Sequence, residues 1–143
     1  IFDVDYRTVN DKWKEGLASS LSFYSWEEKV YERINSYLEN IKKKHVIVEY
    51  DIIAIDPGAV YISRGYLYVR AYVKYRVTAD DMSISTNQLI YGPDTSIAGL
   101  KKGQWKEDVF DIRIVPRSEN HVYMWGVSAS NSLSDWAYSE SFK

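Results

Sequence analysis

Residues 66–78 read YLYVRAYVKYRVT, and this stretch decides the fold. Its side chains alternate between two kinds, as expected for a β-strand, whose successive residues point to opposite faces of the sheet. The length of the run predicts a central strand with a neighbour on each side. One side is apolar and should carry a packed helix: Leu67, Val69, Ala71, Val73, Tyr75 and Val77. The other is aromatic and basic: Tyr66, Tyr68, Arg70, Tyr72, Lys74 and Arg76.

Two amphipathic helices are predicted upstream of this strand, over about 8–23 and 25–44. Thr8 is the expected N-cap signal of the first helix. Ser25 and Glu28 have the spacing of a capping box, in which each side chain satisfies a backbone N–H of the first turn. The second helix should lie on the apolar side of residues 66–78, through a stripe that recurs at helical spacing: Trp26, Val30, Ile34, Leu38 and Ile41.

Strands are predicted on both sides of the central one. Residues 46–53 alternate with period two and are expected to end at Pro57-Gly58, because proline cannot donate to a sheet ladder. A short strand over 59–63 should then lead through a tight turn at Arg64-Gly65 into residues 66–78. Downstream, the pattern predicts a short strand near 84–91 inside an irregular stretch, then strands over 107–115, 121–128 and 135–142, with a turn over 116–120.

This order predicts a single α+β domain over residues 1–143, with two N-terminal helices packed on a curved antiparallel sheet of five or six strands. The order of elements resembles that of the nuclear-transport-factor-2-like (NTF2-like) superfamily, whose helices pack against a strongly curved sheet. A pilin-like arrangement is a second match of the same kind. Because the superfamily includes isomerases, dehydratases, carrier modules and extracytoplasmic domains, the resemblance implies a fold and no single function.

Composition narrows the functional classes. The 143 residues carry a net charge of −2, with no cysteine and two histidines. A nearly neutral chain has no global field for nucleic acid or anionic lipid. Cysteine chemistry is absent, and no nucleotide-binding glycine motif or nucleophile elbow occurs. We therefore predict no cofactor, no metal and no transmembrane segment. The start at Ile1 suggests a processed or excised fragment with room for an upstream anchor, which favours an extracytoplasmic or cell-surface location.

Acid–base chemistry is an open alternative. A carboxyl group held in an apolar pocket beside a tyrosine hydroxyl can act as a general base, because burial raises its pKa. Tyr68 and Tyr72 could supply the hydroxyl. Four acids are candidates, and we favour the interpretation that they lie on the solvated side of the strands: Glu49, Asp51, Asp108 and Asp111.

The aromatic and basic side of residues 66–78 could bind single-stranded nucleic acid, since rings stack on bases and cations meet phosphates. Acids on the neighbouring strands are predicted to pair with these cations and neutralise them, which argues against nucleic acid as the partner. Tyrosine, tryptophan and arginine also dominate protein–protein hot spots.

We therefore predict a non-catalytic binding or assembly domain that recognises a protein partner or a second copy, in a cell-surface, secretion or virion assembly. The alternative is a small-molecule carrier or acid–base enzyme with a pocket between helices and sheet. Single-stranded nucleic-acid binding is the third reading. The candidate binding residues are Tyr68, Arg70, Tyr72, Lys74, Arg76, Trp105 and Trp136.

Overall fold

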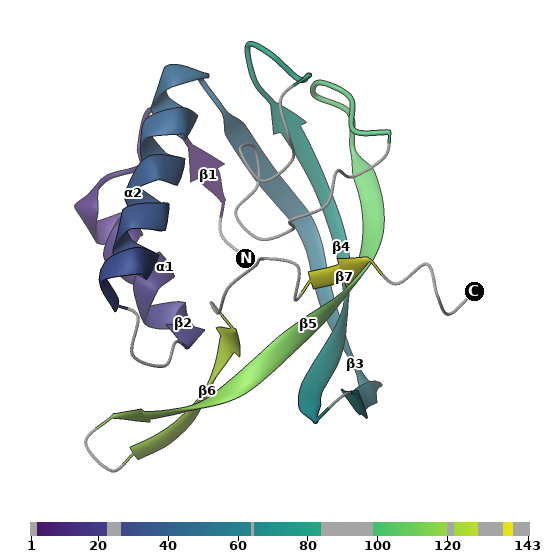
Figure 1. Ribbon diagram of the computed structural model, residues 1–143. Coiled ribbons are helices and arrows are strands. Elements are labelled where there is room, and N and C mark those ends of the chain that lie inside the picture. The colour runs from purple at the N-terminus through teal and green to yellow at the C-terminus, as the bar shows by residue number, and fades with distance from the viewer. Residues whose placement is uncertain are drawn as a thin grey trace.

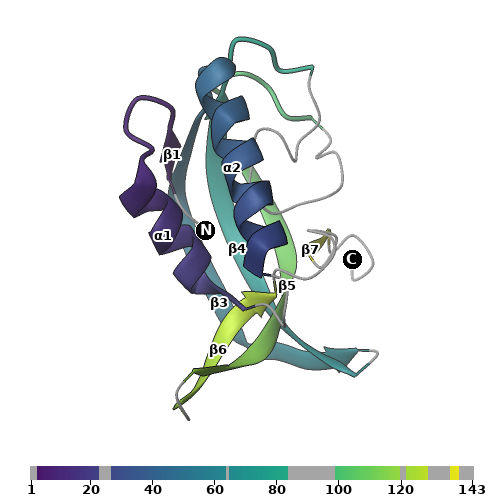
Figure 2. The same cartoon turned by 60° about the vertical axis from the view of Figure 1, so that its left-hand side comes forward.

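Two helices lie on one face of a twisted, open sheet, which confirms the predicted α+β class (Figures 1 and 2). The computed structural model describes residues 3–22, 27–63, 65–83, 99–119, 122–128 and 136–138. Within these ranges the elements in chain order are β1 (Val4–Asp5), α1 (Asp11–Ser20), β2 (Leu21–Ser22), α2 (Glu27–Lys43), β3 (Ile47–Ser63), β4 (Tyr66–Thr78), β5 (Lys106–Glu119), β6 (Val122–Ser128) and β7 (Trp136–Tyr138).

The strand order is β1-β3-β4-β5-β6-β2, with β7 paired to β5. β4 is central, as residues 66–78 predicted, and pairs antiparallel with β3 and β5. The predicted edge strand over 135–142 corresponds to β7, which lies opposite Phe110–Ile112. The two-residue strands β1 and β2 were not predicted, and β2 makes the parallel pairing of the sheet, with β6.

The hydrophobic core lies between the helices and the apolar side of β4. Ala71, Val73, Tyr75 and Val77 are buried, whereas Leu67 and Val69, nearer the start of β4, are only half-buried. The burial alternates with period two, so the predicted packing face is confirmed for the second half of the strand. The side chains that α2 places in this core are Ile34, Tyr37, Leu38 and Ile41.

The predicted start of the first helix was wrong. Helix α1 begins at Asp11, and the Asn10 side chain caps it by accepting a hydrogen bond from the Trp13 backbone N–H at 3.1 Å. Asparagine is among the best N-cap residues. Thr8 lies in the preceding turn, where its N–H donates to the Asp5 carbonyl. The predicted capping box falls on Ser25, which is outside the described residues.

Pro57-Gly58 does not end a strand as predicted, because β3 continues to Ser63. Both halves pair with β4, from Ile47 opposite Thr78 to Ser63 opposite Tyr66. The register shifts between Ile55 and Val60, so the proline lies in a bulge. There the Gly58 N–H donates to the Asp56 carboxylate at 2.8 Å.

The turn predicted over 116–120 was also wrong in its boundary, because β5 runs on to Glu119 and pairs Pro116 with Trp125 of β6. β4 pairs with β5 only as far as Ile114. Beyond that point β5 has a strand neighbour on one side within the described residues, and a two-stranded ribbon tolerates a proline that a central strand would not. The strand predicted near 84–91 falls outside the described residues.

Candidate functional site

The side of β3–β5 turned away from the helices gathers the aromatic and basic side chains of β4. We call it the outer face and define it by Tyr61, Tyr66, Tyr68, Arg70, Tyr72, Lys74, Arg76, Trp105, Asp111 and Arg113. The register brings these residues together from three strands, since Tyr68 lies opposite Tyr61 of β3 and Arg113 of β5. Residues directly opposite on one face of a sheet are close enough for their side chains to touch.

The cations of β4 on this face are paired with acids of the neighbouring strands. The Arg70 guanidinium donates two hydrogen bonds to Asp111, at 2.9 and 3.0 Å. Lys74 Nζ lies 2.9 Å from Asp51 Oδ2, and Arg76 Nη2 donates to Glu49 Oε1 at 2.8 Å. The predicted neutralisation of these three cations is therefore confirmed.

Trp105 joins this face just before β5 begins. The Arg76 guanidinium carbon lies 4.8 Å from its ring centroid, and Lys74 Nζ lies 5.5 Å from it. Arg113 covers the Tyr66 ring in the same way, at 4.1 Å. These contacts have cation–π geometry, in which the ring face attracts the positive charge. The rings of Tyr66, Tyr72 and Trp105 are nevertheless exposed to solvent.

Asp111 is a buried acid of the outer face beside the half-buried Tyr61, and the sequence analysis missed this arrangement. Asp111 is only 1% exposed. Burial, followed by the interaction with the Asp111 carboxylate, raises the pKa of Tyr61 to about 12. The Tyr61 ring also stacks on Tyr68, with centroids 5.4 Å apart. The Arg64-Gly65 turn was the available signal, because a two-residue hairpin places Tyr61 opposite Tyr68.

Of the seven candidate binding residues, six lie together on the outer face. Trp136 begins β7, where its backbone pairs with Ile112 of β5, and its side chain is outside the described part of the structure. Whether Trp136 contributes to the same surface therefore stays a prediction.

The Arg76–Glu49 pair should make a small, pH-dependent contribution to stability. Hydrogen bonding from the Arg76 guanidinium lowers the pKa of Glu49 below its ordinary value of 4.5. A lowered carboxyl pKa stabilises the folded state above the unfolded value, and the gain is lost as pH falls through the folded value. Because both side chains are more than one-third exposed, we expect less than about 1 kcal/mol. Urea unfolding of wild type and Glu49→Gln should differ at neutral pH and converge well below pH 4.5. A constant difference across that range would contradict the assignment.

A second cluster lies on the opposite, helix-facing side of the sheet, and it corrects the interpretation that all four candidate acids face solvent. Asp108 is 6% exposed, opposite Val73 in the core. Its carboxylate accepts hydrogen bonds from the Tyr75 hydroxyl and from Lys106 Nζ, both at 2.6 Å. Asp108 and Asp111 are thus buried on opposite faces, whereas Glu49 is half-buried and Asp51 is exposed.

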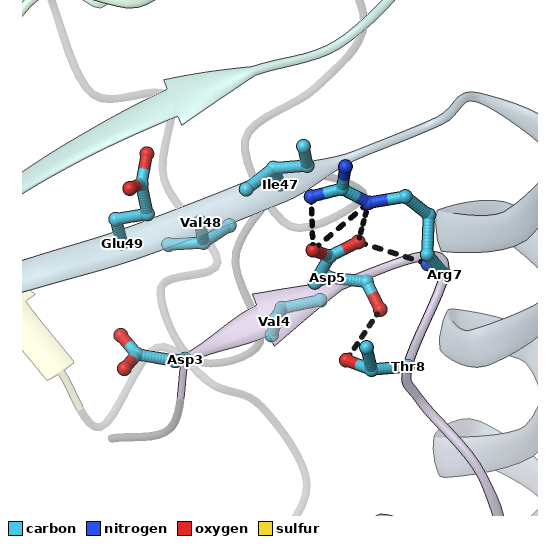
Figure 3. A pocket seen from close by; sticks show the side chains of 8 residues that line it. All are labelled: Asp3, Val4, Asp5, Arg7, Thr8, Ile47, Val48 and Glu49. Carbon is cyan, nitrogen blue, oxygen red and sulfur yellow. Dashed lines mark hydrogen bonds and ion pairs between the residues drawn. The ribbon is translucent and has the colours of Figure 1, made fainter.

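An open pocket lies where β1 pairs with the beginning of β3 (Figure 3). Its acids are already engaged. Asp5 forms an ion pair with Arg7, whose hydrogen bonds lower the pKa of Asp5, and Asp3 accepts the Tyr50 N–H at 3.0 Å. No cluster of three metal-ligating side chains occurs within the described residues.

Neither helix of the described chain is long and apolar enough to cross a bilayer. No protein-family model, curated protein or solved structure matches this chain. The NTF2-like and pilin-like arrangements accordingly remain predictions, and function must be argued from the surfaces themselves.

Proposed function

We propose that this protein is a non-catalytic binding domain that recognises a protein partner through its outer face, as a subunit of a larger assembly. The observation that carries the proposal is the set of exposed rings on the side of the sheet away from the helices: Tyr66, Tyr72 and Trp105. Tyrosine, tryptophan and arginine are the residues most enriched among interface hot spots.

The side chains of the outer face are held in place before any partner binds, which also supports protein binding. Cation–π contacts hold Trp105 and Tyr66 against Arg76 and Arg113 in the unbound protein. A surface whose side chains are already positioned loses less conformational entropy on association. Ion pairs between β4 and its neighbours fix the remaining long side chains, so the rings form a preorganised platform.

The charge balance of the outer face argues against a polyanion as the partner. Its cations on β4 and β5 are Arg70, Lys74, Arg76 and Arg113, and the acids on the same side of the sheet include Glu49, Asp51, Glu107 and Asp111. Binding to a phosphate backbone needs an excess of positive charge. A protein surface with apolar and hydrogen-bonding groups is a better match to neutral rings.

A pocket enzyme or carrier is the second candidate, and Asp108 is the observation that favours it. This carboxylate is buried between sheet and helices beside a tyrosine hydroxyl, as the acid–base alternative requires. Lys106 occupies its second oxygen, however, which favours a structural ion pair over a free base. Native mass spectrometry of the purified protein separates the two, because a carrier should retain a small molecule, whereas a binding domain should show only the mass of its chain or a whole multiple of it.

Site-specific photocrosslinking tests the proposed function. A benzophenone amino acid at Tyr72 should capture a defined protein in the source cells, whereas the same group at Glu39, exposed on α2, should not. Once the partner is identified, Trp105→Ala should weaken its binding by about 30-fold or more, the range of a hot-spot residue. Because Trp105 is exposed, the unfolding free energy should change little. Equal capture from both positions, or unchanged affinity of Trp105→Ala, would overturn the proposal.

A further inference from the structure

The β3–β4 hairpin has a strand edge with no neighbour in the described structure. β4 pairs with β3 along its whole length, but β1 covers only Ile47 and Val48 of the other edge. The Tyr50 N–H, next along this edge, donates to the Asp3 side chain. From Asp51 to Ser63 no described strand lies beside β3. Unpaired strand edges are templates for the addition of another strand.

The same hairpin exposes large aliphatic side chains on the helix-facing side of the sheet. Ile62 is 75% exposed, Ile55 61% and Val60 47%. Their β4 partners are Leu67, Ala71 and Val69, so all three continue the apolar side of the sheet. Figures 1 and 2 show the hairpin extending past the ends of both helices. The core therefore continues as an uncovered apolar surface, of the kind that marks an interaction site.

The edge divides at the bulge into a protected part and an open part. Asp51 before the bulge and Asp56 within it bear charge, and Pro57 in the bulge lacks an N–H. Charges, prolines and bulges are the usual protection of an edge against unwanted pairing. After the bulge, the segment 59–63 (Ala-Val-Tyr-Ile-Ser) has no charge and no proline. Segment 59–63 therefore lacks the charges and the proline that protect the edge from Asp51 to Pro57.

We infer that segment 59–63 pairs with the same segment of a second copy of this chain, forming a two-fold symmetric dimer. A two-fold axis brings identical side chains close together, so a charged edge would repel its own copy. Segment 59–63 carries no charged side chain, so two copies can approach without this repulsion. Antiparallel pairing centred on Tyr61 places Val60 of each copy opposite Ile62 of the other. Both side chains lie on the helix-facing side, so the apolar surface of one hairpin continues directly into that of its copy.

This dimer uses the backbone edge of β3 and the helix-facing side chains of Val60 and Ile62, whereas the proposed function uses the exposed rings of the outer face. The outer face of each copy stays open, and the axis at Tyr61 would place two outer faces side by side on one continuous sheet. The two ideas can therefore fail separately. A protein that binds its partner but stays monomeric would contradict only the dimer through the hairpin. A protein that dimerises but binds no partner would contradict only the function proposed for the outer face.

Sedimentation velocity over a concentration series tests the inference. Wild-type protein should show a monomer–dimer equilibrium, and Ile62→Lys should raise the dissociation constant by more than about tenfold, since it places two ammonium groups near the axis. Asn35→Lys, with the same charge change at an exposed site on α2, should leave it unchanged, and so should Trp105→Ala. Circular dichroism should show all variants folded, because Ile62 makes little contact with the core. A wild-type monomer at every soluble concentration, or a dimer unaffected by Ile62→Lys, would overturn the inference.

Cysteine crosslinking tests the register. The native chain contains no cysteine, so introduced thiols are the only ones present. Directly opposite residues have Cβ atoms about 4.5–5.5 Å apart, close to the range that a disulfide spans. Val60→Cys mixed with Ile62→Cys should form a covalent dimer under mild oxidation faster than either variant alone. Ile55→Cys, on the far side of the bulge, is the control. Equal crosslinking of all samples would contradict pairing centred on Tyr61.

Discussion

Asp108→Ala is expected to lower the free energy of unfolding by about 3–5 kcal/mol in urea denaturation, the range found when one partner of a buried ion pair is removed. The side chain of Asp108 is almost fully buried, and its two oxygens accept hydrogen bonds from Lys106 and Tyr75. Truncation removes the carboxylate from the half-buried Lys106 ammonium group and from the buried Tyr75 hydroxyl. Each such group must be desolvated without full compensation.

Two control variants separate this effect from loss of packing. Glu107→Ala removes a neighbouring but exposed carboxylate, and its effect should stay within about 0.5 kcal/mol. The double variant Lys106→Met with Asp108→Leu replaces the charges by apolar groups of similar size, which is often close to neutral for buried pairs. This double variant should recover much of the free energy of unfolding that Asp108→Ala loses. If Asp108→Ala is no more destabilising than Glu107→Ala, the cluster of Asp108, Lys106 and Tyr75 does not stabilise the fold.

The position of Asp108 could have been predicted from the period of the strand. It lies two residues before Phe110, which belongs with Ile112 and Ile114 to the apolar side of that strand. Alternation therefore points Asp108 inward. An isolated carboxylate is costly to bury, and this general rule misled the sequence interpretation. The groups that make burial tolerable are Lys106 on the same strand and Tyr75 across the sheet, and the second depends on a register that one strand alone does not reveal.

The charge pairing of the outer face could be predicted because it depends only on which strands are neighbours. Opposite charges on adjacent strands stabilise any register that brings them together. The burial of Asp111 could not be predicted in this way. Its neighbour Tyr61 comes from the far half of β3, beyond the bulge. In the sequence, Pro57-Gly58 looks like the end of a strand. Only pairing with β4 on both sides of the bulge makes residues 47–63 a single strand.

Arg70→Ala should destabilise the protein far more than Arg76→Ala, although both remove an arginine from the same face of the same strand. We expect Arg70→Ala to lower the free energy of unfolding in urea clearly more than Arg76→Ala does. Each guanidinium makes two hydrogen bonds to its carboxylate partner. The number of hydrogen bonds therefore does not distinguish them, and the difference must come from the environment of the acid.

Burial of the partner is what differs. The carboxylate side chain is 2% exposed in Asp111 and 43% exposed in Glu49. Without Arg76, water can solvate Glu49, whereas without Arg70 the protein must retain a nearly inaccessible charge. Arg70→Lys should give an intermediate loss, because an ammonium group keeps the charge but cannot make the bidentate contact. Arg70→Met with Asp111→Leu should recover stability relative to Arg70→Ala, since no buried charge is left. Equal losses for Arg70→Ala and Arg76→Ala would show that water reaches Asp111 in solution, and that this part of the outer face opens.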